Sequence, residues 1–197
     1  MIDFNTKDMQ IPFHKFIKYY NDAAALDQPN IEAACLSTVS NNLKPHARFI
    51  NIKYINNNEL IFFSNYTSDK ANNIKLNKNV ALTFYWSLAN IQIRIEGTIK
   101  KLSSIRSDNH WKNRSKYKNA LAISSDQSSL SKSYQEILDN YEYTLENSDL
   151  LHRPSFWGGY VIKPSYFEFW TGHKSRINKR KIFKKNGLNW SEYFLQP

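Results

Sequence analysis

The stretch from Phe156 to Arg180, FWGGYVIKPSYFEFWTGHKSRINKR, joins two kinds of side chain that could bind one molecule. Its first part carries two tryptophans and five other aromatic residues, and its last part carries a histidine and four cations. Aromatic rings offer flat apolar walls, and cations hold phosphate through charge-assisted hydrogen bonds. Three interpretations fit: a nucleic-acid surface, a packed strand beside a solvated basic face, or a pocket for a flat, phosphorylated ligand. The third is favoured by the residues considered below.

Composition sets the broad class of the protein. The chain has 197 residues, of which 41% are hydrophobic and 15% aromatic. This is enough apolar material for one compact domain covering residues 1–197. The net charge of +10 attracts anions but does not distinguish nucleic acid, an anionic membrane or phosphorylated metabolites.

Cysteine usage and the N-terminus suggest a compartment. Cys35 is the single cysteine, so no intrachain disulfide forms, and its apolar neighbours in AACLSTV predict a buried thiol in a reducing cytoplasm. The N-terminus lacks the apolar core of a secretory signal, and no apolar run approaches the roughly 20 residues of a membrane span. The five histidines are scattered, without i, i+4 pairs or cysteine partners, so we expect no metal site. We expect a cytoplasmic protein without a membrane partner.

Hydrophobic periodicity predicts the elements that must position the aromatic and basic residues. Apolar residues at helical spacing predict an amphipathic helix over about residues 8–26, with Pro12 near its start. Further helices are predicted over 68–77, capped by Ser68, over 103–117 and over 131–146. Short strands separated by turn signals are predicted over 33–40, 46–54, 60–64, 80–86, 91–102, 151–162, 166–172, 175–185 and 188–197. The fold class is therefore mainly β (α+β), one domain with a β-barrel core.

The segment NIQIRIEG shows the alternation of a half-buried strand. Ile91, Ile93 and Ile95 are predicted to face the core, and the polar residues between them, Arg94 and Glu96 included, to face solvent or an interface. Trp157 with the glycines that follow it is interpreted as structural, an aromatic packed at a bend where glycine relieves crowding.

Seven segments carry a resemblance to a known family: HARFINIK, FFSNYTSDK, WSLANIQIRIEG, DQSS, RPSFWGGYV, FEFWTGHKSRINKR and a final LQP. In this order and spacing the chain resembles the pyridoxine (pyridoxamine) 5′-phosphate oxidase family, from Pro12 to the C-terminus. PSFWGG together with W-x5-R-x3-R is the most restrictive part. The resemblance implies an FMN-binding split β-barrel with flanking helices, and a homodimer that holds FMN at its interface.

The resemblance also implies which residues contact FMN. Arg48, Ser64 and Lys70 would bind the flavin phosphate, Trp170 would supply an apolar wall, and Arg180 with Gln92 and Gln127 would meet the polar ring edge. The full set of implied FMN contacts is Arg48, Lys53, Phe63, Ser64, Lys70, Gln92, Gln127, Ser128, Trp170 and Arg180. Asp69 departs from the family pattern, because it places a carboxylate where a phosphate-binding arginine usually stands. Either its side chain turns away, or FMN binds more weakly than is usual.

For the substrate phosphate, the resemblance implies Lys53 and Arg114, with His110 and Lys118 standing where the family has a tyrosine and a serine. Arg176 and Asn178 would cover the substrate ring as the catalytic pair, with asparagine in place of the family's histidine. Asparagine can hydrogen-bond but cannot carry a proton as histidine does. These departures leave phosphate capture intact in outline but put the exact substrate in question.

The implied reaction converts pyridoxamine or pyridoxine 5′-phosphate to pyridoxal 5′-phosphate, with dioxygen as acceptor and hydrogen peroxide as product. One alternative is a related flavoprotein that oxidises another ring, as phenazine-biosynthesis relatives do, or that only binds FMN. A basic nucleic-acid-binding module is less favoured, because the lysines are spread along the whole chain and no RNA-binding motif is present.

Overall fold

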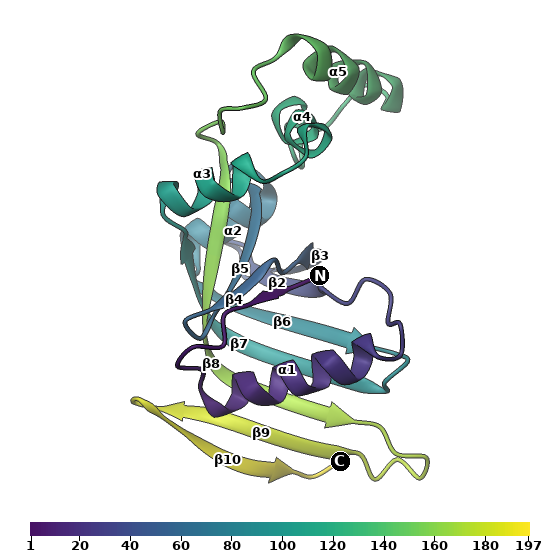
Figure 1. Ribbon diagram of the computed structural model, residues 1–197, viewed down its shortest axis with the longest axis vertical. Helices are drawn as coiled ribbons and strands as arrows, with labels where there is room; N and C mark the ends of the chain where they lie inside the picture. The colour runs from purple at the N-terminus through teal and green to yellow at the C-terminus, as the bar shows by residue number, and fades with distance from the viewer.

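A computed structural model describes residues 1–197 and contains a curled ten-stranded sheet and five helices (Figure 1). The path through the sheet is β1-β4-β5-β8-β7-β6-β2-β3, and β9 and β10 continue from β8. The strands are β1 (Asp3–Phe4), β2 (Ala33–Val39), β3 (Pro45–Asn51), β4 (Tyr54–Asn56), β5 (Glu59–Asn65), β6 (Asn79–Trp86), β7 (Ile91–Lys101), β8 (Trp157–Thr171), β9 (Lys179–Asn186) and β10 (Asn189–Leu195). The helices are α1 (Ile11–Ala24), α2 (Asp69–Leu76), α3 (Ser104–Lys112), α4 (Lys116–Ser124) and α5 (Tyr134–Asn147).

Strand β8 organises the sheet. Its first six residues pair with β5, its last six pair with β9, and β7 runs along its other side. The sheet therefore divides at the middle of β8, with α3, α4 and α5 at one end of the molecule and the β9–β10 hairpin at the other (Figure 1). Any site built on both halves of β8 must span most of the molecule.

A β-bulge marks the point where the sheet divides. The β7–β8 register shifts between Glu96 and Gly97, and Gly97 lies opposite Pro164. A Cβ on Gly97 would overlap the backbone carbonyl of Lys163, so only glycine fits. Bulges bend and twist the strand that contains them, and proline is tolerated there because a ladder hydrogen bond is already lost. The bulge accounts for the bend of this long strand.

The core lies between the curled sheet and α1, which crosses it (Figure 1). Phe16 is fully buried and meets Phe84 and Trp86 edge-on, with ring centroids 5.1 and 5.6 Å apart. Phe13 makes a similar contact with Phe167 on β8 at 5.1 Å. These contacts fix α1 against β6 and β8, and leave the opposite face of those strands free for other roles.

Most of the predicted elements are confirmed. The predicted helix over 8–26 is α1, and Ile91, Ile93 and Ile95 are all buried, as the alternation in β7 requires. Ser68 does occupy the N-cap of α2, but its hydroxyl makes no capping hydrogen bond there. Trp157 is buried and a Cβ on the next residue, Gly158, would overlap the side chain of Tyr66, as the structural interpretation expects, and Trp157 also lines a cavity described below.

Four predictions are wrong in detail. Segments 151–162 and 166–172 form the single strand β8, because Pro164 falls at the bulge and does not end the strand. Segment 46–54 breaks into β3 and β4, because the chain leaves β2 after Ile52 and the backbone amide of Lys53 bonds to the Ile61 carbonyl on β5. Segment 103–117 is two helices, because α3 ends at Lys112 and a new N-cap follows at Ser115. Cys35 is half-buried, because it lies on the β2 face that alternates away from the core.

Candidate functional site

A buried lysine at the start of α2 is the centre of the first group of predicted residues. The Lys70 ammonium donates to the Ser64 hydroxyl at 2.9 Å, the Ser68 hydroxyl at 2.9 Å and Gln127 Oε1 at 2.6 Å. Lys70 is 7% exposed, and burial, with a smaller contribution from the charge of Arg48, lowers its pKa to about 8. All three partners are neutral oxygens. A buried cation without a carboxylate partner is an arrangement that favours a bound anion.

Arg48 adds a second cation close to Lys70. Its Nη1 donates to the carbonyl oxygens of Leu36 and His46 and to the Thr38 hydroxyl at 2.7 Å, again without a carboxylate. Burial lowers the pKa of Arg48 below its usual value. Both cations are therefore held by neutral groups that leave their charge available to a ligand.

Asp69 and Ser128 lie at the edge of this group. The Asp69 backbone amide donates to the Ser128 hydroxyl at 3.4 Å, and the Asp69 side chain is exposed in the first turn of α2. An acidic residue at a helix N-terminus stabilises the helix through the macrodipole. The carboxylate thus has a structural role that does not require it to point at a ligand.

Three flat side chains form a stack beside Lys70 and Ser64. The rings of Phe63 and His110 are 3.6 Å apart and nearly parallel at 8°, and Trp157 continues the stack 5.5 Å from Phe63. The Tyr54 hydroxyl lies 2.9 Å from His110 Nδ1. Burial first, and then the charges of three nearby cations, lower the pKa of His110 to about 4. His110 is therefore a neutral imidazole at pH 7.

The three cations that act on His110 are those predicted for substrate phosphate: Arg114, Lys53 and Lys118. The Arg114 guanidinium lies 4.8 Å from the Trp157 ring centroid, and its Nη1 donates to the Lys118 carbonyl. Burial lowers the pKa of Arg114 to about 10, so it stays charged at pH 7. Lys53 is also 3.4 Å from a carboxylate oxygen of Glu32.

A cavity of about 220 Å³ is lined by two hydrogen-bond partners of Lys70 and by two of the stacked aromatic rings. Phe63, Ser64 and Gln127 line it together with Arg114 and Trp157. Residues predicted for FMN and for substrate therefore share one hollow. Apolar walls with a few converging polar groups are typical of small-molecule sites.

A second group of predicted residues forms a row across three strands at the other end of β8. Gln92 on β7 pairs with Trp170 on β8, and Trp170 pairs with Arg180 on β9. Directly paired residues point to the same face of a sheet, and neighbouring strands are about 4.8 Å apart. This face is opposite to the one that packs on α1, so the row presents an amide, an indole and a guanidinium away from the core.

The loop between β8 and β9 carries the predicted catalytic pair. Asn178 Oδ1 accepts from the His173 backbone amide at 3.1 Å, and the Arg176 backbone amide donates to the His173 carbonyl at 2.8 Å. Arg176 has a left-handed backbone with a φ of 63°, which is uncommon for a residue with a Cβ. Its side chain is exposed at the end of the molecule that holds Trp170.

The two groups are far apart within one chain. Ser64 pairs with Gly158 and Gln92 pairs with Trp170, so twelve residues of β8 separate them. At about 3.3 Å per residue this is about 40 Å along the strand. A single flavin is much shorter than this path.

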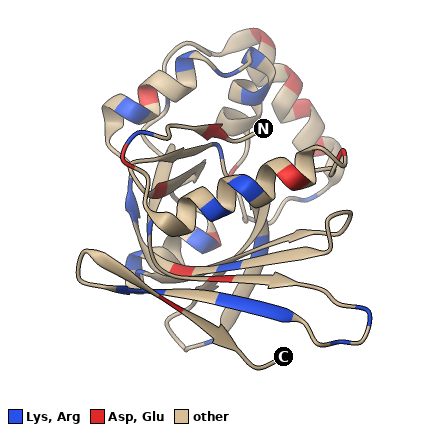
Figure 2. Ribbon diagram, turned by 60° about the horizontal axis from the view of Figure 1, so that its bottom comes forward, with Lys and Arg blue, Asp and Glu red and all other residues tan.

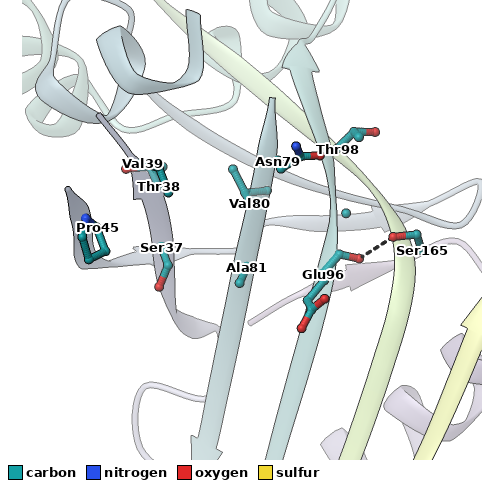
Figure 3. A pocket seen from close by; sticks show the side chains of 11 residues that line it. Ser37, Thr38, Val39, Pro45, Asn79, Val80, Ala81, Glu96, Thr98 and Ser165 are labelled. Atoms are coloured by element: carbon teal, nitrogen blue, oxygen red, sulfur yellow. Dashed lines mark hydrogen bonds between the residues drawn. The ribbon is translucent and has the colours of Figure 1, made fainter. Parts of the chain in front are cut away.

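The hollow beside β2, β6 and β7 lacks these features. Its volume is about 390 Å³, it contains none of the predicted site residues, and Glu96 is its one ionisable side chain (Figure 3). The lysines and arginines are spread over helices and strands rather than gathered into one basic face (Figure 2). None of the helices is both long and apolar enough to cross a membrane.

Two residues of interest were not singled out from the sequence. Tyr54 follows the break between β3 and β4, and only the fold brings it to His110. Glu168 stands two residues before Trp170 on β8, so its position on the same face of the sheet was predictable from the sequence. Its partners Arg94 and Arg180 were not, because they depend on strand register.

Comparison with solved structures defines the class of protein. The chain matches the structure of PhzG from Burkholderia lata, solved with tetrahydrophenazine-1-carboxylic acid, with a TM-score of 0.90 and 24% identity over 97% of this chain and 95% of that one. It also matches a pyridoxamine 5′-phosphate oxidase-related, FMN-binding protein from Nostoc punctiforme, with a TM-score of 0.81 and 16% identity over 96% and 100% of the two chains. At these identities the likeness concerns the fold, which is the split β-barrel of FMN-binding proteins.

Sequence comparison identifies the family. Residues 23–146 match the pyridoxamine 5′-phosphate oxidase model, and residues 157–197 match the pyridoxine 5′-phosphate oxidase C-terminal dimerisation region. The chain is 35% identical to the pyridoxine/pyridoxamine 5′-phosphate oxidase of Leptospira biflexa over 94% of this chain and 89% of that one. For the enzyme of Aliarcobacter butzleri the values are 37%, 97% and 92%. The chain belongs to the pyridoxine/pyridoxamine 5′-phosphate oxidase family of oxidoreductases.

Proposed function

We propose that residues 1–197 form one domain that dimerises with a second copy and oxidises pyridoxamine or pyridoxine 5′-phosphate to pyridoxal 5′-phosphate with bound FMN. The observation that carries this is the pair of cations, Lys70 and Arg48, held by neutral oxygens beside the cavity lined by Phe63 and Trp157. Relatives in the family carry the same activity in their names, and a structural neighbour is described as FMN-binding. The anion that would complete the two cations is the FMN phosphate.

The donor set fits FMN. Lys70 and Arg48 would hold the phosphate through charge-assisted hydrogen bonds, with the Ser64 and Ser128 hydroxyls completing the cradle. Gln127, expected at the ring edge, is bonded to Lys70 and Ser64 and so joins this cradle in the proposal. Lys53 and Phe63 belong to the same proposed set. Gln92, Trp170 and Arg180 of the second copy would contact the ring, because one chain holds these two groups at opposite ends of β8. FMN thus binds at the dimer interface.

The substrate phosphate would be held by cations that face the aromatic stack. Arg114 and Lys53 supply charge, and Lys118 adds an exposed cation near His110. His110, being neutral, offers a hydrogen bond rather than charge. With the FMN phosphate and the substrate phosphate held by separate groups of cations, the flavin and the substrate ring would be fixed face to face. Such positioning lowers the activation barrier of the oxidation.

When bound, FMN supplies the oxidising chemistry by accepting two electrons from the substrate carbon that bears the amine or alcohol and passing them to dioxygen, which yields hydrogen peroxide. The chain's own residues orient and shield. Arg176 would cover the substrate ring and stabilise the charge that develops during oxidation, and Asn178 would fix the loop through His173. The stack of Phe63, His110 and Trp157 would exclude water on the opposite side.

Oxidation of another ring, of the phenazine type, is the second candidate function. Three features favour it: His110 is engaged with Phe63 and Tyr54, the Asn178 amide oxygen is engaged with His173, and the PhzG fold matches closely. The first two features each occupy a polar group that would otherwise be free to select the B6 ring.

The deciding experiment uses the purified protein loaded with FMN. Its visible spectrum is recorded, and pyridoxamine 5′-phosphate is then added without oxygen. Bleaching of the flavin band supports the proposed activity. A flavin band that persists with both B6 phosphates moves the substrate to another ring, and a protein that stays colourless with added FMN contradicts the proposal entirely.

A further inference from the structure

A buried carboxylate lies directly beneath the row of ring-contacting residues. Glu168 is two residues before Trp170 on β8, faces the same side of the sheet and is 2% exposed. An ionised carboxylate is seldom buried unless several donors satisfy it. Glu168 has three such donors, one from its own strand and one from each of the two neighbouring strands.

The contacts of Glu168 are short and complete. Its Oε1 accepts from Arg180 Nε at 2.7 Å, and its Oε2 accepts from Arg94 Nη1 at 2.9 Å and from the Tyr166 hydroxyl at 3.2 Å. Burial opposes ionisation, but the hydrogen bond and charge of Arg180, together with Arg94, outweigh it and hold the pKa of Glu168 below its usual value. The pKa of Arg180 is raised in return, chiefly by this hydrogen bond.

Arg180 is held at two points as a result. Besides the bond to Glu168, its Nη1 donates to the Gln196 carbonyl at 3.0 Å. A guanidinium has five N–H groups in a rigid plane, so two fixed bonds determine where the remaining ones point. By strand register, Arg180 lies on the face of the sheet that Trp170 and Gln92 share, which is the surface proposed to meet the flavin.

We propose that Glu168 is a positioning residue for FMN: it locks the Arg180 guanidinium beside Trp170, so that the flavin ring edge meets a cation in one fixed orientation. This rests on the proposed function, because it assigns Arg180 to FMN. Fixed, preorganised donors bind a charged edge better than mobile ones, because little reorganisation is needed on binding. A cation held there also favours the reduced flavin.

The network contains its own matched control. Arg94 contacts the other oxygen of the same carboxylate and also the Glu96 side chain at 3.1 Å, but it does not contact Arg180. Arg94→Met therefore removes one partner of the buried Glu168 carboxylate but keeps the hydrogen bond between Glu168 and Arg180. Glu168→Gln keeps the side-chain shape and removes the charge.

The experiment measures the FMN dissociation constant and the flavin midpoint potential for wild type, Glu168→Gln, Arg94→Met, Arg180→Met and the double variant Glu168→Gln/Arg180→Met. Thermal unfolding of each apoprotein reports on the fold. We expect Glu168→Gln to weaken FMN binding roughly 5-fold and to lower the midpoint potential, with a much smaller effect from Arg94→Met. In the Arg180→Met background, Glu168→Gln should add nothing, because it acts through Arg180.

Two results overturn this inference but leave the proposed function standing. The first is equal weakening of FMN binding by Glu168→Gln and Arg94→Met, which would show that the buried charge is purely structural. The second is an additive effect of Glu168→Gln and Arg180→Met on FMN binding. If Arg180→Met itself leaves FMN binding unchanged, the assignment of Arg180 fails with it. If the wild-type protein does not bind FMN, the proposed function fails, and the inference fails as a consequence.

Discussion

At the scale of single residues, Asp69 is the clearest departure within the proposed phosphate site. Its charge is close enough to oppose the lowering of the Lys70 pKa, so it is also close enough to repel a bound phosphate. Asp69→Arg should tighten FMN binding roughly 10-fold, because a repulsive charge is replaced by a charge-assisted donor. Fluorescence quenching of FMN on titration with apoprotein measures this.

Asp69→Asn serves as the control for Asp69→Arg, since it removes the repulsion without adding a donor and should give an intermediate affinity. An FMN dissociation constant that is the same in all three proteins would show that the carboxylate points away from the phosphate. In that case Asp69 acts only by stabilising the N-terminus of α2.

Protonation of His110 should make the free energy of unfolding depend on pH. Its pKa is about 4 in the folded chain, against an ordinary value near 6.5, so between these pH values the unfolded chain binds more protons. The free energy of unfolding should therefore fall as pH is lowered from about 6.5 to about 4. His110→Phe, which keeps the stack on Phe63, should flatten this part of the profile in urea denaturation.

His14 is exposed on α1, so His14→Phe is the matched control and should retain the wild-type slope. The comparison between variants matters because carboxyl groups also titrate near pH 4. If His110→Phe left the pH dependence of the free energy of unfolding unchanged, His110 would bind its proton as readily in the folded chain as in the unfolded one. Its neutral role beside the substrate cations would then be wrong.

At the scale of elements, the bulge at Gly97 sets the shape of β8 and hence the distance between the two residue groups. Gly97→Ala should destabilise the protein by about 2 kcal/mol or more, because the new Cβ meets the rigid backbone of Lys163 rather than a movable side chain. Thr98→Ala, on the same strand at an exposed position, should change stability by less than about 0.5 kcal/mol. Chemical denaturation of both variants tests this, and equal midpoints would contradict it.

The elements also show what could be predicted from the sequence. Strands such as β7 were predictable because alternation of isoleucine with polar residues depends only on local pattern. The continuity of β8 was not, because Pro164 resembles a strand end unless the bulge opposite it is known. Within the site, Ser64 and Lys70 are local neighbours, whereas Gln127 reaches them only through the fold and Trp170 meets Gln92 only through strand register.

At the scale of the whole molecule, the proposed FMN contacts lie at opposite ends of β8, so we expect each FMN to be shared by two chains. In a twofold dimer each site then combines Lys70 of one chain with Arg180 of the other. Lys70→Met and Arg180→Met should each weaken FMN binding, strongly but measurably, at both sites of a homodimer, so that neither site remains tight. Their combinations in differently tagged heterodimers distinguish a shared site from one built within a chain.

When the two substitutions are carried on different chains, one site receives both defects and the other receives none, so tight FMN binding should return to about one site per dimer. When both substitutions are carried on one chain and its partner is wild type, every site has one defect, and no tight site should remain. A site contained within a single chain predicts the reverse, with the intact partner binding one FMN and the divided arrangement binding none. Because the two heterodimers contain the same substitutions in the same number, differences in overall stability do not explain a difference between them, and FMN stoichiometry alone decides whether the interface completes the site.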